Sequence, residues 1–233
     1  MTQQDYLDTL LETYHLVHVM ADKNNCRVLH LRHKELGRDL VVRQLAYPVA
    51  AYTTLCDLLC ENLPQVYDVV DTVDGQTVLE EYVDGVTVAA LAEGGQIRYR
   101  QAKKILRGVC HALSVLHQNG FVHRDVKPEN VLVRSNGQAV LVDLNISRQV
   151  TTAGRDTRIM GTVGYASPEQ LGLTQSDART DIYACGVLLN VMLTGKHPSE
   201  QLARGRAGRI VRRCTAVNPD DRYRTAHRLA LAL

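Results

Sequence analysis

Residues 121–145 read FVHRDVKPENVLVRSNGQAVLVDLN, and the interpretation of the whole chain starts from this stretch. Two short pieces within it, 131–134 and 139–142, are rich in β-branched residues and are separated by Ser-Asn-Gly at 135–137. Turn residues of this kind between two strand-like runs are typical of a hairpin. The stretch therefore predicts two paired strands, with a polar loop before the first and a polar tripeptide after the second.

Four polar side chains border these predicted strands. Asp125, Lys127 and Asn130 lie on the loop before the first strand, and Asp143 follows the second, so we expect all four in one cleft. A carboxylate on a loop can accept a proton from an attacking hydroxyl, and a lysine supplies a point charge. An asparagine oxygen and a second carboxylate are hard ligands for Mg²⁺ bound to phosphates. The pattern favours phosphoryl transfer over the alternative of a charged surface loop.

The same residues resemble the catalytic loop of the protein kinases, H-R-D-x-K-P-x-N, and DLN at 143–145 stands where that family has D-F-G. The resemblance implies that Asp125 is the catalytic base and that Lys127 contacts the γ-phosphate of ATP. It also implies that Asn130 and Asp143 hold magnesium. The Lys-Pro-Glu order is similar to that of serine/threonine kinases, and Arg124 argues for a protein substrate.

The segment before residue 85 resembles the nucleotide-binding strands of a kinase, with altered details. Predicted strands occupy 15–20, 26–32 and 39–45, and the turn 21–25 stands where the family has its glycine-rich loop. That turn contains no glycine, so its backbone cannot approach phosphates closely. We expect weak nucleotide binding from this element.

The third of these strands, DLVVRQL, resembles the family's V-A-I-K strand and places Arg43 at the position of the lysine. An edge-strand arginine that points to solvent is the alternative. A helix over 48–61 resembles helix αC, but no carboxylate lies within a turn of Ala51, where its glutamate is expected. Glu80 stands at the gatekeeper position, and a buried carboxylate there needs a partner. We therefore predict a replacement ion pair between Arg43 and Glu80.

The resemblance assigns further nucleotide contacts within and after residues 77–85, which resemble the family's fifth strand and the hinge that follows it. Glu81 and Val83 would offer backbone groups to adenine, and Leu132 would line the floor of the pocket. Together with Arg43, Glu80 and Lys127 these residues make up the expected ATP site.

The second half of the chain resembles the helical part of a kinase. Periodic apolar residues predict a helix over 96–117 that stops at Asn119-Gly120, in which His111 and His117 are expected to be exposed or packing residues. A second, apolar helix opens at Asp181, whose carboxylate is implied to secure the catalytic loop. Arg222 resembles the arginine that pairs with the glutamate of the P-E motif, here Glu169.

Residues 143–169 form the expected activation segment, and GTVGYASPEQ at 161–170 is similar to the bacterial G-T-x-x-Y-x-x-P-E-Q. Thr162 resembles the threonine that hydrogen-bonds the catalytic aspartate and lysine. Asn145 replaces the glycine of D-F-G and is expected to tolerate a positive φ there. The candidates for regulatory phosphorylation are Thr151, Thr152 and Thr157. The alternative for each of them is a polar loop residue without a regulatory role.

Composition adds few constraints to this interpretation. The chain has 233 residues, 27 Lys and Arg against 25 Asp and Glu, and a net charge of +2, which indicates neither a nucleic acid nor a membrane partner. The six cysteines are scattered, which favours buried thiols in a reducing compartment over zinc at Cys56 and Cys60. No apolar run reaches the roughly 18–20 residues of a membrane span, and the polar start lacks signal-peptide features. We expect a soluble, cytoplasmic chain without a membrane segment.

An arginine-rich segment, 204–213, lies near the end of the chain. It is explained either as a solvated helix face or as a docking site for an acidic partner. No aromatic residues are interleaved with the arginines, so the segment does not indicate nucleic-acid binding.

The chain is therefore expected to have the α+β, two-lobed protein kinase fold, abbreviated after the apolar helix that opens at Asp181 and resembles the family's helix αF. Residues 1–233 would form one kinase domain, with an N-lobe of about 1–81 and a C-lobe of about 82–233. The resemblance is to eukaryotic-like (Hanks-type) bacterial serine/threonine kinases with a degenerate N-lobe, and it implies ATP and Mg²⁺ as cofactors. Two functions remain open: a slow enzyme, or a pseudokinase that acts as a binding module.

Overall fold

The computed structural model describes residues 1–23, 25–145, 147–149, 164–171 and 176–233. The chain divides into two compact units. The N-terminal unit contains residues 1–60 and 64–83, and the C-terminal unit contains residues 61–63 and 84–233.

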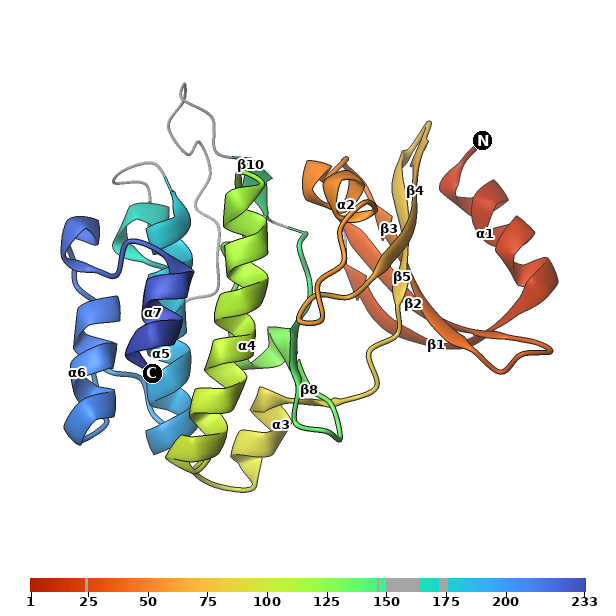
Figure 1. The fold of residues 1–233 in the computed structure, drawn as a ribbon. Coiled ribbons are helices and arrows are strands. Elements are labelled where there is room, and N and C mark those ends of the chain that lie inside the picture. Colours follow the sequence, from red (N-terminus) through yellow and green to blue (C-terminus); the bar gives the residue numbers. More distant parts are fainter. Residues whose placement is uncertain (24, 146, 150–163, 172–175) are drawn as a thin grey trace. The chain divides into compact units, whose positions relative to one another are not determined.

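The N-terminal unit is built on a five-stranded antiparallel sheet with the order β1-β2-β3-β5-β4. The central strand β3 is buried along nearly all of its length, as its run of apolar residues requires. Helix α1 (Gln3–Thr13) and helix α2 (Ala50–Leu55) lie on opposite sides of the sheet (Figure 1). The strands are β1 (Tyr14–Lys23), β2 (Cys26–His33), β3 (Asp39–Leu45), β4 (Val66–Thr72) and β5 (Gly75–Glu81).

Helix α1 belongs to the core of this unit. Its Leu7 packs with Leu29, Leu31, Leu40 and Val42 from strands β2 and β3 in one buried cluster. The helix begins in a capping box, since the Thr2 side chain accepts from the Asp5 N–H and the Asp5 carboxylate accepts from the Thr2 N–H. One face of the sheet is therefore closed by a helix that the strand pattern did not indicate.

Two sequence expectations are wrong in this unit. Strand β1 continues to Lys23 and β2 begins at Cys26, so the turn is shorter than the expected 21–25. Helix α2 covers only Ala50–Leu55 instead of 48–61. Its N-cap residue, Val49, makes no side-chain capping bond, and two β-branched threonines follow within the helix, so little local stabilisation extends it.

The C-terminal unit consists mainly of helices, with α4 and α5 packed side by side (Figure 1). Three short strands form a sheet of order β6-β8-β9, and β7 pairs with β10. After α5, the described residues form only α6, one 3₁₀ turn and α7. The elements are β6 (Val86–Thr87), α3 (Val88–Glu93), α4 (Tyr99–Gln118), β7 (Phe121–Val122), η1 (Pro128–Asn130), β8 (Val131–Val133), β9 (Ala139–Leu141), β10 (Arg148–Gln149), η2 (Pro168–Leu171), α5 (Ala178–Thr194), α6 (Gly205–Cys214), η3 (Pro219–Asp221) and α7 (Ala226–Ala232).

Helix α5 forms the centre of the C-terminal unit. Most of its residues are buried, and Ile182, Leu188 and Leu189 have no exposed surface, as expected for a helix surrounded by others. The helix begins at Ala178 with Asp177 as N-cap, one turn before the expected start at Asp181. Asp181 is consequently held inside the first turn, where its carboxylate faces the protein interior. The expected α+β class, with a strand-rich first part and a helical second part, is confirmed.

No helix within the described ranges is long and apolar enough to cross a membrane. Cys110, Cys185 and Cys214 are buried in the C-terminal unit as thiols. Buried thiols of this kind behave as small apolar side chains.

Candidate active site

The loop between β7 and η1 is anchored by one buried carboxylate. Asp181, with no exposed surface, accepts the His123 N–H at 2.9 Å through Oδ2 and the Arg124 N–H at 2.8 Å through Oδ1. Burial alone would raise the pKa of Asp181, but the hydrogen bond and charge of His117 and the hydrogen bond from the Arg124 N–H hold it below its ordinary value. Asp181 therefore remains ionised and fixes the loop backbone, as the resemblance implied.

His123 connects the loop to the end of strand β9. Its Nδ1 accepts the Asp125 N–H at 3.3 Å, and its Nε2 donates to the Val142 carbonyl at 3.2 Å. Burial lowers the pKa of the imidazole, and this outweighs the opposing charges of Asp181, Asp143 and Asp125. A neutral His123 thus connects Asp125 with Val142, the residue before Asp143.

Asp125, Lys127 and Asn130 form one hydrogen-bonded cluster. The Lys127 Nζ lies 2.7 Å from the Asp125 Oδ2, and the side chains are 20% and 13% exposed. The Asn130 amide NH₂ donates to the same Oδ2 and to the Asp125 carbonyl, each at 2.9 Å. Asp125 is therefore oriented by two donors while it remains accessible from solvent. This arrangement suits a carboxylate that receives a proton from an incoming hydroxyl.

Asp143 follows strand β9 directly beside this cluster. The Val142 N–H donates to the Asn130 carbonyl at 2.9 Å, so the residue before Asp143 is tied to Asn130. The Asn145 N–H lies 3.4 Å from the Asp143 Oδ1. The structure thus brings the four polar residues predicted from the sequence into one region of the C-terminal unit.

Two non-glycine residues in the described part of the chain have a positive φ, and both belong to this site: Arg124 at 71° and Asp143 at 69°. Asn145, which was expected to tolerate a positive φ at this turn, does not have one, because the left-handed residue is Asp143, two positions earlier. A left-handed conformation costs a non-glycine residue roughly 1–3 kcal/mol. At Arg124 the surrounding contacts impose it, since its N–H binds Asp181 and its carbonyl accepts from Gln170 at 2.9 Å.

The donor set of Asn130 and Asp143 fits a hard divalent cation. Both Asn130 amide hydrogens are directed at Asp125, so its Oδ1 is the atom left to meet a metal. Together with the Asp143 carboxylate this provides two oxygen ligands, the number that Mg²⁺ commonly takes from protein when phosphates complete its shell. The chemistry of these side chains is therefore compatible with magnesium bound to a phosphate ester.

The N-terminal unit contains the predicted ion pair. Arg43 on β3 lies opposite Val78, and Glu80 lies two residues along on β5, so the two side chains share one face of the sheet as a diagonal pair. The Arg43 Nε is 2.5 Å from the Glu80 Oε1, and the side chains are 9% and 4% exposed. The alternative of a solvent-pointing arginine is therefore wrong. Helix α2, AAYTTL, contributes no carboxylate to this pair.

The other expected nucleotide contacts lie at element ends. Glu81 ends β5, and its N–H donates to the Gln65 carbonyl at 2.8 Å. Val83 is the last residue of the N-terminal unit and is buried. Leu132 is half-buried in the middle of β8, opposite Val140 on β9. Thr162 and the candidate phosphorylation sites Thr151, Thr152 and Thr157 fall outside the described residues.

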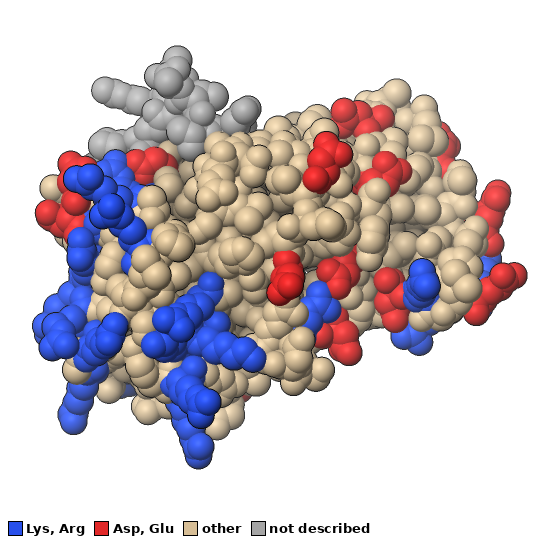
Figure 2. Space-filling model, in the orientation of Figure 1, with Lys and Arg blue, Asp and Glu red and all other residues tan. Residues whose placement is uncertain are grey.

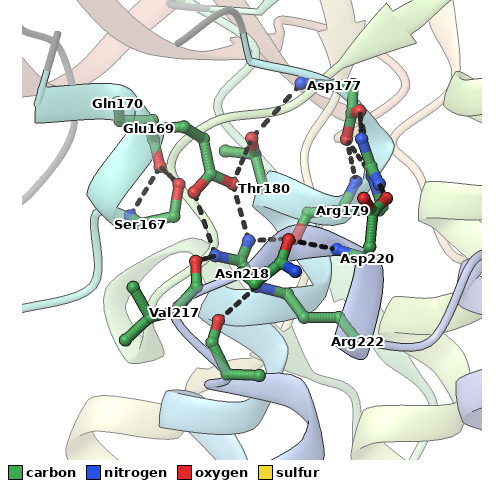
Figure 3. Close-up of polar contacts among 11 residues, drawn as sticks. Ser167, Glu169, Gln170, Asp177, Arg179, Thr180, Val217, Asn218, Asp220 and Arg222 are labelled. Atoms are coloured by element: carbon green, nitrogen blue, oxygen red, sulfur yellow. Dashed lines mark hydrogen bonds and ion pairs between the residues drawn. The ribbon is translucent and has the colours of Figure 1, made fainter. Parts of the chain in front are cut away.

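A second buried ion pair joins the P-E motif to the end of the chain (Figure 3). The Arg222 Nη1 and Nη2 donate to the two oxygens of Glu169 at 2.6 and 2.9 Å, and Arg222 is 1% exposed. The Thr180 hydroxyl donates to the same carboxylate at 3.1 Å. Burial alone would raise the pKa of Glu169, but the bonds and charge of Arg222 lower it below its usual value. The predicted pairing of these residues is confirmed.

Sequence reasoning missed two residues that support the loop. The Gln170 amide donates to the Arg124 carbonyl, and the His117 Nε2 lies 2.8 Å from the Asp181 Oδ2. Gln170 could have been found because it follows directly on the P-E pair. His117 had no such signal, because its partner is 64 residues away and the two meet only when α4 packs on α5.

Comparison with known proteins agrees with this geometry. A family model described as "Protein kinase domain" matches residues 50–228, which leaves strands β1 to β3 outside the match. Serine/threonine-protein kinase PknB of Mycolicibacterium smegmatis is 32% identical over 200 residues, or 71% of this chain and 32% of that protein. PknB of Mycobacterium tuberculosis is 34% identical over 149 residues, or 59% of this chain and 24% of that protein.

A probable serine/threonine-protein kinase of Clostridium perfringens is 36% identical over 149 residues, or 63% of this chain and 22% of that protein. The chain thus spans about a third or less of the length of these relatives. Because each of them is named as a kinase, the comparisons do not favour the pseudokinase alternative. The chain belongs to the protein kinase domain family, and its relatives place it among the bacterial serine/threonine kinases of the Hanks type.

Proposed function

We propose that the chain transfers the γ-phosphate of ATP to serine or threonine hydroxyls of a protein, slowly and with weak nucleotide binding. One observation carries the proposal: the Asp125 carboxylate is oriented by Lys127 and Asn130 on a loop whose backbone is fixed by Asp181. Phosphoryl transfer depends mainly on positioning and charge stabilisation. The oriented Asp125 carboxylate supplies the positioning, and the Lys127 cation beside it supplies the charge stabilisation.

Each residue of the cluster then has a defined role. Asp125 accepts the proton of the substrate hydroxyl, and Lys127 stabilises negative charge on the transferring group. Asn130 and Asp143 would hold Mg²⁺, which when bound neutralises charge on the phosphates. Thr162 is assigned to support Asp125 and Lys127 by its match to the family motif.

The N-terminal unit accounts for the weak binding. Arg43, paired with Glu80, takes the place of the phosphate-contacting lysine, and neither the turn after β1 nor helix α2 provides the usual glycine or glutamate. We assign adenine contacts to the backbone of Glu81 and Val83 and to the Leu132 side chain. Weaker contacts to the phosphates reduce the affinity for ATP and the rate of phosphoryl transfer, but they do not change the type of reaction.

We further propose that residues 1–233 act as one kinase domain, with an N-lobe of about 1–81 and a C-lobe of about 82–233. Its phosphate acceptor would be a protein, because Arg124 precedes the base. The buried thiols Cys110, Cys185 and Cys214 suit a reducing compartment, and an ATP donor suits the cytoplasm.

The proposal predicts magnesium-dependent transfer of label from γ-labelled ATP to a protein acceptor such as myelin basic protein. Addition of excess EDTA should abolish the label, because two protein oxygens without a cation leave the phosphate charge uncompensated. ATP at about ten times its Kd, with Mg²⁺, should also stabilise the fold by about 1.4 kcal/mol in a thermal-shift titration. Absence of both label and thermal shift would support the pseudokinase instead.

Replacement of Arg43 by lysine is expected to lower both stability and transfer rate. Lysine keeps the charge but loses the planar fork that meets the Glu80 carboxylate, at a cost of about 1–2 kcal/mol. Melting curves and initial rates at several ATP concentrations would measure the two effects. Arg38→Lys, at an exposed arginine in the turn before β3, is the matched control. A higher transfer rate after Arg43→Lys would contradict this prediction and show that the arginine lowers activity despite its pairing with Glu80.

A further inference from the structure

Helices α4, α6 and α7 carry basic side chains without acidic ones. They contain nine of the chain's 27 Lys and Arg and none of its 25 Asp and Glu, which leaves 18 basic residues against 25 acidic ones elsewhere. Figure 2 shows these charges gathered over the region of α4 and α6. We call this set the basic face: Arg100, Lys103, Lys104, Arg107, Arg206, Arg209, Arg212, Arg213 and Arg228.

The cations of the basic face are held close to one another by packing. The Arg107 Nε donates to the Ala230 carbonyl at 3.3 Å, and the Arg206 Nη2 donates to the Ala232 carbonyl at 2.9 Å, so both guanidinium groups meet at the end of α7. Burial and the neighbouring charges of Arg107 and Arg206 lower the pKa of Lys103. Like charges from α4 and α6 are thus brought together at the end of α7.

These charges have no ionic partner within the described residues. None of the nine makes an ion pair there, although five other arginines do pair with carboxylates in the N- or C-terminal unit: Arg27, Arg32, Arg43, Arg179 and Arg222. The contacts of the basic face with described residues include Arg213 over the Tyr223 ring at 4.4 Å and hydrogen bonds from Lys104, Arg107 and Arg206 to backbone carbonyls. A solvated helix face normally mixes both signs of charge, so the one-sided distribution is the feature to be explained.

A pocket opens directly beside the basic face. It has a volume of about 460 Å³ and lies where α4, the end of α5 and the start of α6 meet. Buried Ala203 and Ala207 line it together with Leu193, and exposed Tyr99, Arg204 and Arg206 also contribute. Arg206 therefore belongs both to the basic face and to the pocket. A hollow of this size accepts one or two apolar side chains.

We propose that the basic face and this pocket dock an acidic, extended segment of a partner protein. Carboxylates of the segment contact Lys103, Arg107 and Arg206, and one apolar side chain enters the pocket beside Ala207. Charge complementarity at such a surface mainly sets association rate and specificity, and the apolar anchor provides affinity. Nucleic acid fits less well, because stacking platforms of exposed aromatic rings accompany most single-strand sites, and among the pocket residues only Tyr99 is aromatic.

Fluorescence polarisation with a labelled peptide tests the proposal. The probe is a peptide of about twelve residues that alternates Glu with Ser around one central Leu, titrated with the full chain in the absence of nucleotide. We expect saturable binding at about 50 mM salt that weakens at about 500 mM, since surface charges are screened. Lys103→Glu combined with Arg206→Glu should weaken binding at least about tenfold. Because no ATP is present, failure of the proposed phosphoryl transfer would leave this result unchanged.

The controls distinguish an acidic peptide from other possible ligands of the basic face and the pocket. Arg38→Glu together with Lys34→Glu makes the same charge change on the N-terminal unit and should leave binding unchanged. Replacing the Glu residues of the peptide with Gln, or its Leu with Ser, should each weaken binding. Equal loss in both double variants would overturn the proposal. So would binding to anionic vesicles of phosphatidylglycerol, or to an oligonucleotide, with no binding to the peptide.

Discussion

Asp125→Asn is expected to reduce the rate of phosphoryl transfer by about 10²–10⁴-fold, the usual contribution of a positioned general base. Asparagine has nearly the same shape and can still accept a bond from Lys127, which lies 2.7 Å from the native Asp125 Oδ2. An amide cannot take up the proton of an attacking hydroxyl at neutral pH. The loss should therefore appear in the rate of label transfer and much less in the affinity for ATP.

The control for this substitution lies on the same loop. Glu129→Gln removes one negative charge from an exposed carboxylate four residues further on, and should leave the rate within about twofold of the native chain. Circular dichroism and melting curves of both variants would establish that they are folded. If Asp125→Asn retained most of the activity while Glu129→Gln did not, Asp125 would not be the base and the assignment of the cluster would fail.

Arg222→Met is expected to destabilise the fold by about 3–5 kcal/mol, because it leaves the Glu169 carboxylate buried without its partner. Arg222 also donates to the carbonyl groups of Ala216, Val217 and Arg179, so its removal leaves three more acceptors without this donor. Denaturant titration with fluorescence or circular dichroism would measure the difference in the free energy of unfolding.

Arg179→Met is the matched control for the same chemical change at a more exposed pair. Arg179 binds Asp177 and Asp220, and the Asp220 side chain is 81% exposed, so the loss should be about 1 kcal/mol or less. A loss in Arg222→Met no larger than that in Arg179→Met would contradict the structural role of the buried pair.

The pH dependence gives the Arg222 prediction an independent readout. The folded-state pKa of Glu169 lies below its usual value, so its ionisation stabilises the fold at neutral pH. This contribution is present above the unfolded-state pKa and is lost as the pH falls through the lowered folded-state pKa. The native chain should therefore lose more stability than Glu169→Gln on acidification, and the two unfolding free energies should converge.

Some of the site followed from the sequence because its information is local. The loop from His123 to Asn130 places three functional groups within eight residues, and the hairpin after it brings Asp143 back to them. The Arg43–Glu80 pair followed from two strand registers, since side chains two positions apart on neighbouring strands share a face. Such patterns depend on periodicity and turn chemistry, which single sequences display.

Other features depended on contacts that the sequence does not display. The extent of helix α2 was overestimated because apolar residues continue past Leu55, where the helix ends. Positive φ occurs at Asp143 and Arg124, whereas local propensity favoured Asn145, and at Arg124 long-range hydrogen bonds to Asp181 and Gln170 impose it. His117 became a partner of Asp181 only through the packing of α4 on α5.

The amino-acid sequence by itself determined the family, the α+β class and the identity of the polar groups that can perform phosphoryl transfer. Only the tertiary structure decided which of these groups touch, which carboxylates are buried beside cations, and that basic side chains of α4 and α6 gather with no acidic partner among the described residues. The physical reason is that secondary structure and turns follow from neighbouring residues, whereas burial and ionic pairing depend on residues brought together by packing.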